Sequence, residues 1–174
     1  MAMEKTIVVA LFLTTLVVVT MSAPTPATDY MCSKIGLWGG NEGSLVDIPE
    51  IPKRLDRVTI ISNYSINAIE FSYTDQTGEK RSAGPWGGSG GTAHKIHLAS
   101  SEVVKEVSGT YNKFDGEICL TSFKLVTNSR TWGPWAEENG ERFSITAPVG
   151  TSVVGFFARE GGYLDAIGVY LNKM

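Results

Sequence analysis

The chain has 174 residues, of which 43% are hydrophobic and 19% are charged, and its formal net charge is −3 at pH 7. This length and apolar content are enough for one domain with a full core. A near-neutral chain lacks the concentrated positive charge that nucleic acid or an anionic membrane surface requires, so we expect neither as a partner.

The N-terminus has the layout of a secretory signal peptide. Lys5 precedes an apolar run from Ile7 to Val19, and small residues, Pro and Thr follow between Met21 and Thr28. The run is short for a membrane span of about 20 residues. We predict a signal peptide over residues 1–27, cleaved between 22 and 27, a secreted mature chain and no membrane insertion after cleavage. An uncleaved signal anchor is the alternative.

If the chain is secreted, its two cysteines can form disulfides and its one sequon can be glycosylated. Cys32 and Cys119 would pass through an oxidising compartment, where a Cys32–Cys119 disulfide or a bridge between chains through Cys32 can form. Cys119 also suits a small buried hydrophobe, and the sequence does not choose between these states. Asn63 begins an Asn-Tyr-Ser sequon and is a candidate N-glycosylation site.

A Gly-Trp segment occurs three times along the chain. Trp38, Trp86 and Trp135 lie at its centre and recur with a period of roughly 48 residues. The segments are 36–43, 84–91 and 133–140. Because all three copies retain the Trp, we predict that the tryptophans serve packing rather than ligand stacking.

A second repeated segment covers residues 66–71, 120–125 and 164–169. Its second position is Asn67 in the first copy, Thr121 in the second and Asp165 in the third. A carboxylate therefore occupies only one of three equivalent positions.

The residues between these segments have strand patterns. Apolar and polar residues alternate over 69–74, and β-branched or apolar runs occupy 58–61, 96–98, 103–107 and 143–145. Gly, Pro and Asn clusters separate them as turns. The predicted fold class is all-β, with three similar sheets.

The order of the repeats predicts how the third unit closes. Asn67 and Thr121 are each followed by a Gly-Trp segment, whereas Asp165 is not. The unused copy is the N-terminal one. We therefore expect the chain ends to pair and to bring residues 36–43 beside 161–165, which would also protect the terminal strands from exposure as open edges.

The segment Gly161–Asp165 lies between two apolar runs and has the residues of a ligand-binding loop. Gly161 and Gly162 allow close approach to the backbone N–H groups, Asp165 supplies acceptor oxygens, and Tyr163 offers an aromatic edge. An uncharged, hydroxyl-rich ligand such as a sugar needs this mixture. The alternative is a surface turn whose Asp caps its own backbone.

Together these segments resemble the jacalin-related lectin family from Lys34 to Asn172. The residues that carry the resemblance are Gly-Leu-Trp-Gly-Gly at 36–40, Gly-Pro-Trp-Gly-Gly at 84–88, Leu-Thr-Ser-Phe at 120–123 and the ending 161–170. The resemblance implies a jacalin-type lectin domain over 28–174. It also implies a β-prism of three four-stranded Greek-key sheets with pseudo-threefold symmetry.

The resemblance further implies a metal-independent sugar site without cofactor or catalysis. Galactose-preferring members of the family are cleaved at the position matching Gly43, whereas Gly43 lies here in a continuous segment. Mannose- or glucose-containing glycans and glycoproteins are therefore the implied partners. Only one site per chain is expected, since Asn67 stands where two-site members of the family carry an Asp. A shallow site of this kind binds a monosaccharide at about millimolar Kd, so we expect a homo-oligomer. The implied carbohydrate-binding residues are Gly43, Gly161, Gly162, Tyr163, Leu164 and Asp165.

Other functions fit the residues less well. A glycosidase needs two facing carboxylates, and Glu42 is the only nearby candidate to partner Asp165. His94 and His97 have a spacing that points them to opposite faces of a strand, which makes a poor metal site. A secreted β-trefoil protease inhibitor and a lectin-fold protein-interaction module without sugar binding remain as alternatives. The resemblance suggests a plant defence lectin, secreted to the apoplast or held in a vacuole.

Overall fold

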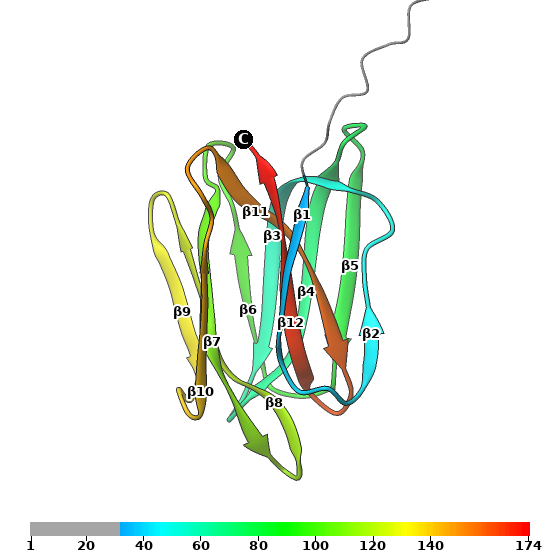
Figure 1. The fold of residues 1–174 in the computed structure, drawn as a ribbon, viewed down its shortest axis with the longest axis vertical. Helices are drawn as coiled ribbons and strands as arrows, with labels where there is room; N and C mark the ends of the chain where they lie inside the picture. Colours follow the sequence, from blue (N-terminus) through cyan, green and yellow to red (C-terminus); the bar gives the residue numbers. More distant parts are fainter. Residues whose placement is uncertain (1–31) are drawn as a thin grey trace, which may run out of the picture.

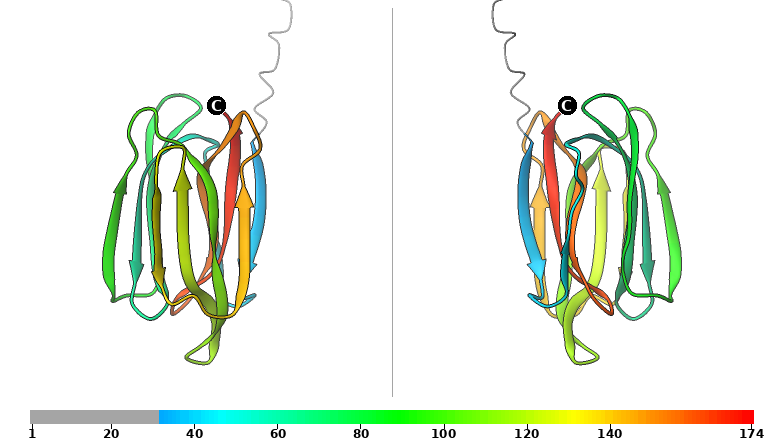
Figure 2. Two further views of the ribbon diagram at one scale, coloured as in Figure 1. Left: turned by 90° about the vertical axis from the view of Figure 1, so that its left-hand side faces the viewer. Right: turned by 90° about the vertical axis from the view of Figure 1, so that its right-hand side faces the viewer.

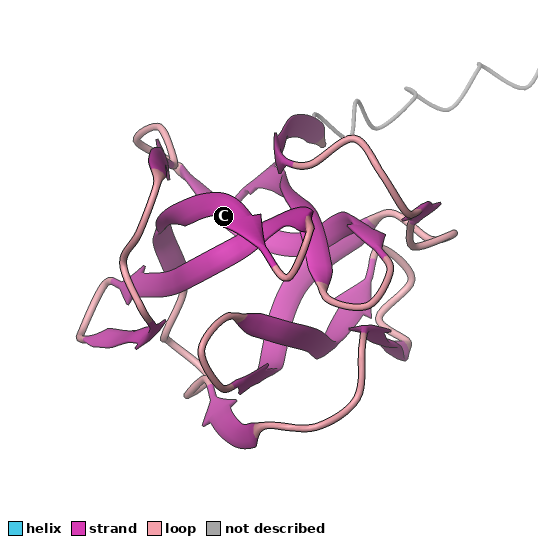
Figure 3. Cartoon of the chain, turned by 90° about the horizontal axis from the view of Figure 1, so that it is seen from below, coloured by secondary structure: helices cyan, strands magenta, loops and turns pink. Residues whose placement is uncertain are grey.

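The computed structural model describes residues 32–174, and the predicted signal peptide over 1–27 lies outside the described residues. Within 32–174 the chain forms twelve β-strands and no helix (Figures 1 and 3). The predicted all-β class is confirmed. The strands fall into three units of four.

Two units are built from consecutive stretches of chain. One has the strand order β5-β4-β3-β6 and the other the order β9-β8-β7-β10. In each, three hairpin-connected strands are followed by a fourth that returns beside the first, which is a Greek key. The bounds of the first unit are β3 (Pro52–Ser62), β4 (Ile66–Asp75), β5 (Lys80–Gly87) and β6 (Thr92–His97). Those of the second are β7 (Val104–Phe114), β8 (Glu117–Thr127), β9 (Thr131–Ala136) and β10 (Glu141–Thr146).

The third unit combines the two ends of the described chain, as predicted. Its order is β1-β12-β11-β2, with Gly39 opposite Ala166 and Leu45 opposite Arg159. Figure 2 shows blue β1 beside red β12. One residue pair, Val153 with Val104, joins this unit to β7. The bounds are β1 (Ser33–Gly39), β2 (Ser44–Val46), β11 (Thr151–Glu160) and β12 (Leu164–Lys173).

The three units share one core. On β4 the predicted alternation holds, since Ile69, Phe71 and Tyr73 are buried whereas Glu70 is exposed. At the centre, Phe156 of β11 meets Phe71 of β4 at 5.3 Å and Phe123 of β8 at 6.2 Å between ring centroids. Each unit therefore contributes an aromatic ring to a common contact, which makes the three sheets faces of one prism.

The repeated tryptophans pack within and between the units. Trp38 stacks on Phe143 of β10 at 5.4 Å, and Trp135 lies 5.8 Å from the His94 ring on β6. Trp86 packs edge-on against Phe71 inside its own unit. These contacts support the predicted structural role of the tryptophans.

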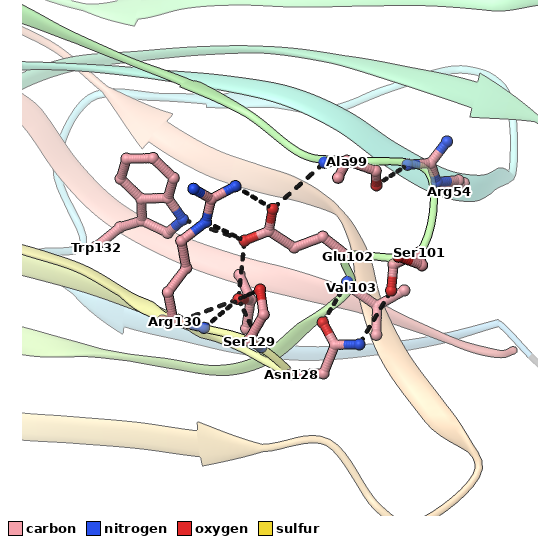
Figure 4. A network of polar contacts seen from close by, with 10 residues as sticks. Arg54, Ala99, Ser101, Glu102, Val103, Asn128, Ser129, Arg130 and Trp132 are labelled. Atoms are coloured by element: carbon pink, nitrogen blue, oxygen red, sulfur yellow. Dashed lines mark hydrogen bonds and ion pairs between the residues drawn. The ribbon is translucent and has the colours of Figure 1, made fainter.

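The loop ahead of β7 is held by an ion pair whose carboxylate is buried (Figure 4). Glu102 is 3% exposed and accepts hydrogen bonds from Arg130 Nε at 2.9 Å and Nη2 at 2.6 Å. Thr127, Trp132 and the Ala99 N–H donate to the same carboxylate. The Arg130 guanidinium and these further donors hold the pKa of Glu102 well below its usual range.

One repeat position tests how the backbone constrains the sequence. Ala136 has φ 61, whereas the equivalent Gly39 and Gly87 have φ 130 and 116. An L-residue in the left-handed region is strained by about 1 kcal/mol, part of which Gly recovers despite its greater unfolded-state entropy. Ala136→Gly should therefore raise the free energy of unfolding by about 0.5–1 kcal/mol in urea titration.

Gly87→Ala is the matched control at the equivalent position. Its Cβ would overlap the carbonyl oxygen of Asn67, and its φ lies outside the left-handed minimum that Ala136 occupies. We expect a loss of more than about 2 kcal/mol. A less stable Ala136→Gly variant would contradict the argument.

Candidate functional site

The candidate site lies at the end of the prism where β12 begins. The β1–β2 loop (40–43) and the β11–β12 loop (161–163) meet there because β1 pairs with β12 and β2 with β11. The Gly40 N–H donates to the Asp165 carbonyl at 2.8 Å and docks the first loop. Segments from opposite ends of the chain thus share one mouth, as the repeat order predicted.

The Asp165 side chain is buried at this mouth with little to compensate its charge. The residue is 1% exposed, and among residues 32–174 its Oδ1 has no hydrogen-bond partner. Burial, together with the charges of Glu117 and Glu42, raises the pKa of Asp165 to about 6, and Arg159 partly offsets the rise. Buried carboxylates in native proteins normally have donors, so this exception points to a ligand.

Two glycines give access to the other carboxylate oxygen. A Cβ on Gly43, whose φ is 68, would overlap Asp165 Oδ2. A Cβ on Gly161 would lie 2.8 Å from the same oxygen. Both positions therefore need glycine to keep the carboxylate accessible, and the structure brings the predicted Gly43, Gly161 and Asp165 together.

The β11–β12 loop presents backbone donors. Gly161 N–H donates to the Tyr163 carbonyl at 3.0 Å, while no acceptor within residues 32–174 takes the N–H of Gly162 or Tyr163. Leu164 is fully buried. The loop offers uncovered N–H groups beside a carboxylate.

Tyr163 is positioned by the β7–β8 hairpin. Its ring meets Phe114 edge-on at 5.3 Å, and its hydroxyl donates to Asp115 Oδ2 at 3.4 Å. The aromatic edge that the sequence predicted is therefore held in place by residues of the second repeat, about 50 positions away in the chain.

Two further residues of the site were not predicted. Glu117, at the start of β8, has its Oε2 3.5 Å from the position of a Cβ on Gly162. Arg159 Nη1 donates to the Gly43 carbonyl at 3.3 Å. Neither residue is part of a repeated motif, and only the hairpin length and strand register bring them to the mouth.

At the equivalent position of the first unit, the backbone hydrogen bond is the same but the side chain differs. The Gly88 N–H donates to the Asn67 carbonyl at 2.9 Å, which matches the contact of Gly40 with Asp165. Asn67 offers an amide in place of a carboxylate. Asn63 is exposed in the adjoining turn.

The remaining candidates do not form a second site. In residues 32–174 no group of three or more His, Cys, Asp or Glu could hold a metal ion. His94 Nε2 lies 3.2 Å from Ser62 Oγ, which is a structural contact. Cys119 is buried, Cys32 is partly exposed, and both are free thiols. Among the described residues no helix is long and apolar enough to cross a membrane.

Comparison with known proteins identifies relatives of this architecture. Residues 35–170 match the family model described as a Jacalin-like lectin domain. Horcolin from Hordeum vulgare is 38% identical over 140 residues, which cover 80% of this chain and 96% of horcolin.

Solved structures of similar proteins have the same fold. AcmJRL, a mannose-binding jacalin-related lectin from Ananas comosus, superposes with a TM-score of 0.78 at 36% identity, covering 82% of this chain and 99% of that protein. The artocarpin–mannotriose complex superposes with a TM-score of 0.73 at 26% identity, covering 80% and 97%. The predicted β-prism is confirmed, and the chain belongs to the jacalin-related lectin family, whose members bind carbohydrate and are not enzymes.

Proposed function

We propose that this chain binds mannose- or glucose-containing glycans, without metal, at the Asp165 mouth. The observation that carries the proposal is the buried Asp165 carboxylate, whose Oδ1 has no donor among the described residues and which lies next in the chain to a loop with uncovered backbone N–H groups. Sugar hydroxyls would donate to the carboxylate and accept from Gly162 and Tyr163. Gly43 would line the opposite side, and Leu164 would contribute its N–H.

The preference for mannose or glucose rests on the first loop and on the relatives. Gly43 lies inside a continuous segment, and its carbonyl accepts from Arg159, so no α-amino group is offered to the sugar. The Ananas comosus protein is described as mannose binding, and artocarpin was solved with mannotriose. Both descriptions support a mannose-type ligand here.

We further propose that the protein acts as a secreted, plant-defence homo-oligomer. At a mouth open to water, hydrogen bonds to a ligand replace hydrogen bonds to water and add little net free energy of binding. Strong binding to a glycan therefore requires several linked sites. Secretion would follow from the predicted signal peptide over residues 1–27. Sedimentation equilibrium of the mature chain should give more than one protomer, and a monomer at all concentrations would contradict this part of the proposal.

The affinity for methyl α-mannoside should depend on pH through Asp165. Its pKa of about 6 means that the carboxylate is mostly ionised at pH 7 and mostly protonated at pH 5. A protonated acid loses acceptor capacity and charge-assisted bonding, so the association constant should fall about tenfold between these values. Isothermal titration calorimetry across this range measures it.

Asp165→Asn is the control for that profile. It should bind weakly and without the pH dependence. Because the folded pKa lies above the unfolded value of about 3.8, the folded protein loses stability as pH rises from about 4 through 6. The variant should therefore be more stable than the native protein by about 1–3 kcal/mol at pH 7 and nearly equal at pH 4. A native affinity that is flat in pH would contradict the assigned role.

A further inference from the structure

The carboxylates around the Asp165 mouth come from different elements. Glu42 lies in the β1–β2 loop, Glu117 begins β8 and Glu160 ends β11. Glu160 has a structural use, because its Oε2 accepts the Gly87 N–H at 2.8 Å. Glu42 and Glu117 have no hydrogen-bonded or ion-paired partner in the part of the chain described. We define these two residues as the acidic rim.

Several acidic side chains elsewhere in residues 32–174 are paired with a cation. Lys80 contacts Asp56 at 2.8 Å. Further pairs are Arg81 with Asp75, Arg130 with Glu102, Lys124 with Glu106 and Arg142 with Glu138. At the mouth, the cation that acts on Asp165 is Arg159, and its Nη1 is directed to the Gly43 carbonyl. The mouth therefore holds an excess of negative charge.

The acidic rim is close to where a sugar would sit. Glu117 Oε2 lies 3.5 Å from the Cβ position of Gly162, whose N–H is one of the uncovered donors. Glu42 is exposed and directly precedes Gly43. The buried Asp165 Oδ1, without a partner in residues 32–174, is an independent observation that supports a ligand here.

We infer that Glu42 and Glu117 make the site charge-selective. A glycan with a cationic group beside the bound sugar is preferred over a neutral one, and a glycan with an anionic group there is bound more weakly than the neutral one. This inference rests on the proposed sugar site and specifies its ligand class as neutral or amine-bearing mannosides. Glycans with uronic or sialic acid next to the bound residue are bound more weakly.

The expected size follows from Coulomb's law. Each carboxylate acts on a ligand charge several ångströms away through solvent that is nearly water-like and screened by salt. Replacing a positive ligand charge by a negative one doubles the difference in binding free energy relative to a neutral ligand. The second carboxylate doubles this difference again. The ammonium and carboxylate forms of one mannoside should then differ about tenfold in Kd at low salt, and the difference should shrink in 1 M NaCl.

The test uses three α-mannosides that share one sugar and differ in the aglycone. These are 2-aminoethyl, 2-hydroxyethyl and carboxymethyl α-mannoside, titrated calorimetrically at pH 7.5 into the mature protein. The expected order of affinity is ammonium, neutral, carboxylate. Three equal affinities would overturn the charge selectivity and leave the proposed function intact. Failure of all three mannosides to bind would instead overturn the proposed function and the inference with it.

Two variants locate the effect. Glu42→Gln combined with Glu117→Gln should bring the three affinities to within about twofold. Glu70→Gln removes an exposed acid from the outer face of β4 and should preserve the tenfold spread. A spread that survives in the double variant, or collapses equally in Glu70→Gln, would overturn the assignment to the acidic rim. Circular dichroism checks that each variant is folded.

Discussion

The antiparallel pairing of β1 with β12 is the constraint on which the site depends. It closes the third sheet from the two ends of the domain and sets Gly39 against Ala166. Gly39 also has no room for a Cβ, because one would overlap the Asp165 carbonyl. This tight approach lets the next residue, Gly40, dock on Asp165 and carries Gly43 over its carboxylate. The strand pairing that closes the third sheet therefore also forms the mouth.

Two buried carboxylates illustrate opposite environments for the same group. Glu102 is surrounded by Arg130 and other donors, and its pKa is lowered. Asp165 is equally buried, has no such donors within residues 32–174, and its pKa is raised. The first arrangement favours the ionised, folded state, whereas the second leaves hydrogen-bonding capacity for a ligand at a cost in stability.

Much of this arrangement could be predicted from the sequence because it repeats. The Gly-Trp segments marked the three units, and the missing partner after Asp165 implied that the chain ends meet. Glu117 and Arg159 could not be found in this way. Glu117 reaches the mouth through the β7–β8 hairpin, and Arg159 through the register of β11 with β2, where it lies opposite Leu45. Neither hairpin length nor register leaves a repeated pattern. The thiol states of Cys32 and Cys119 also required three-dimensional placement.

The most direct test of the central claim is the titration of the Asp165 carboxyl carbon by ¹³C NMR, with and without methyl α-mannoside. The free protein should titrate near pH 6. If the sugar hydroxyls donate to the ionised carboxylate, a ligand concentration of ten times Kd should lower this pKa by about one unit, since binding favours the charged form. A carboxyl resonance whose titration is unchanged by saturating sugar would contradict the account, because the sugar would then bind elsewhere or not through Asp165.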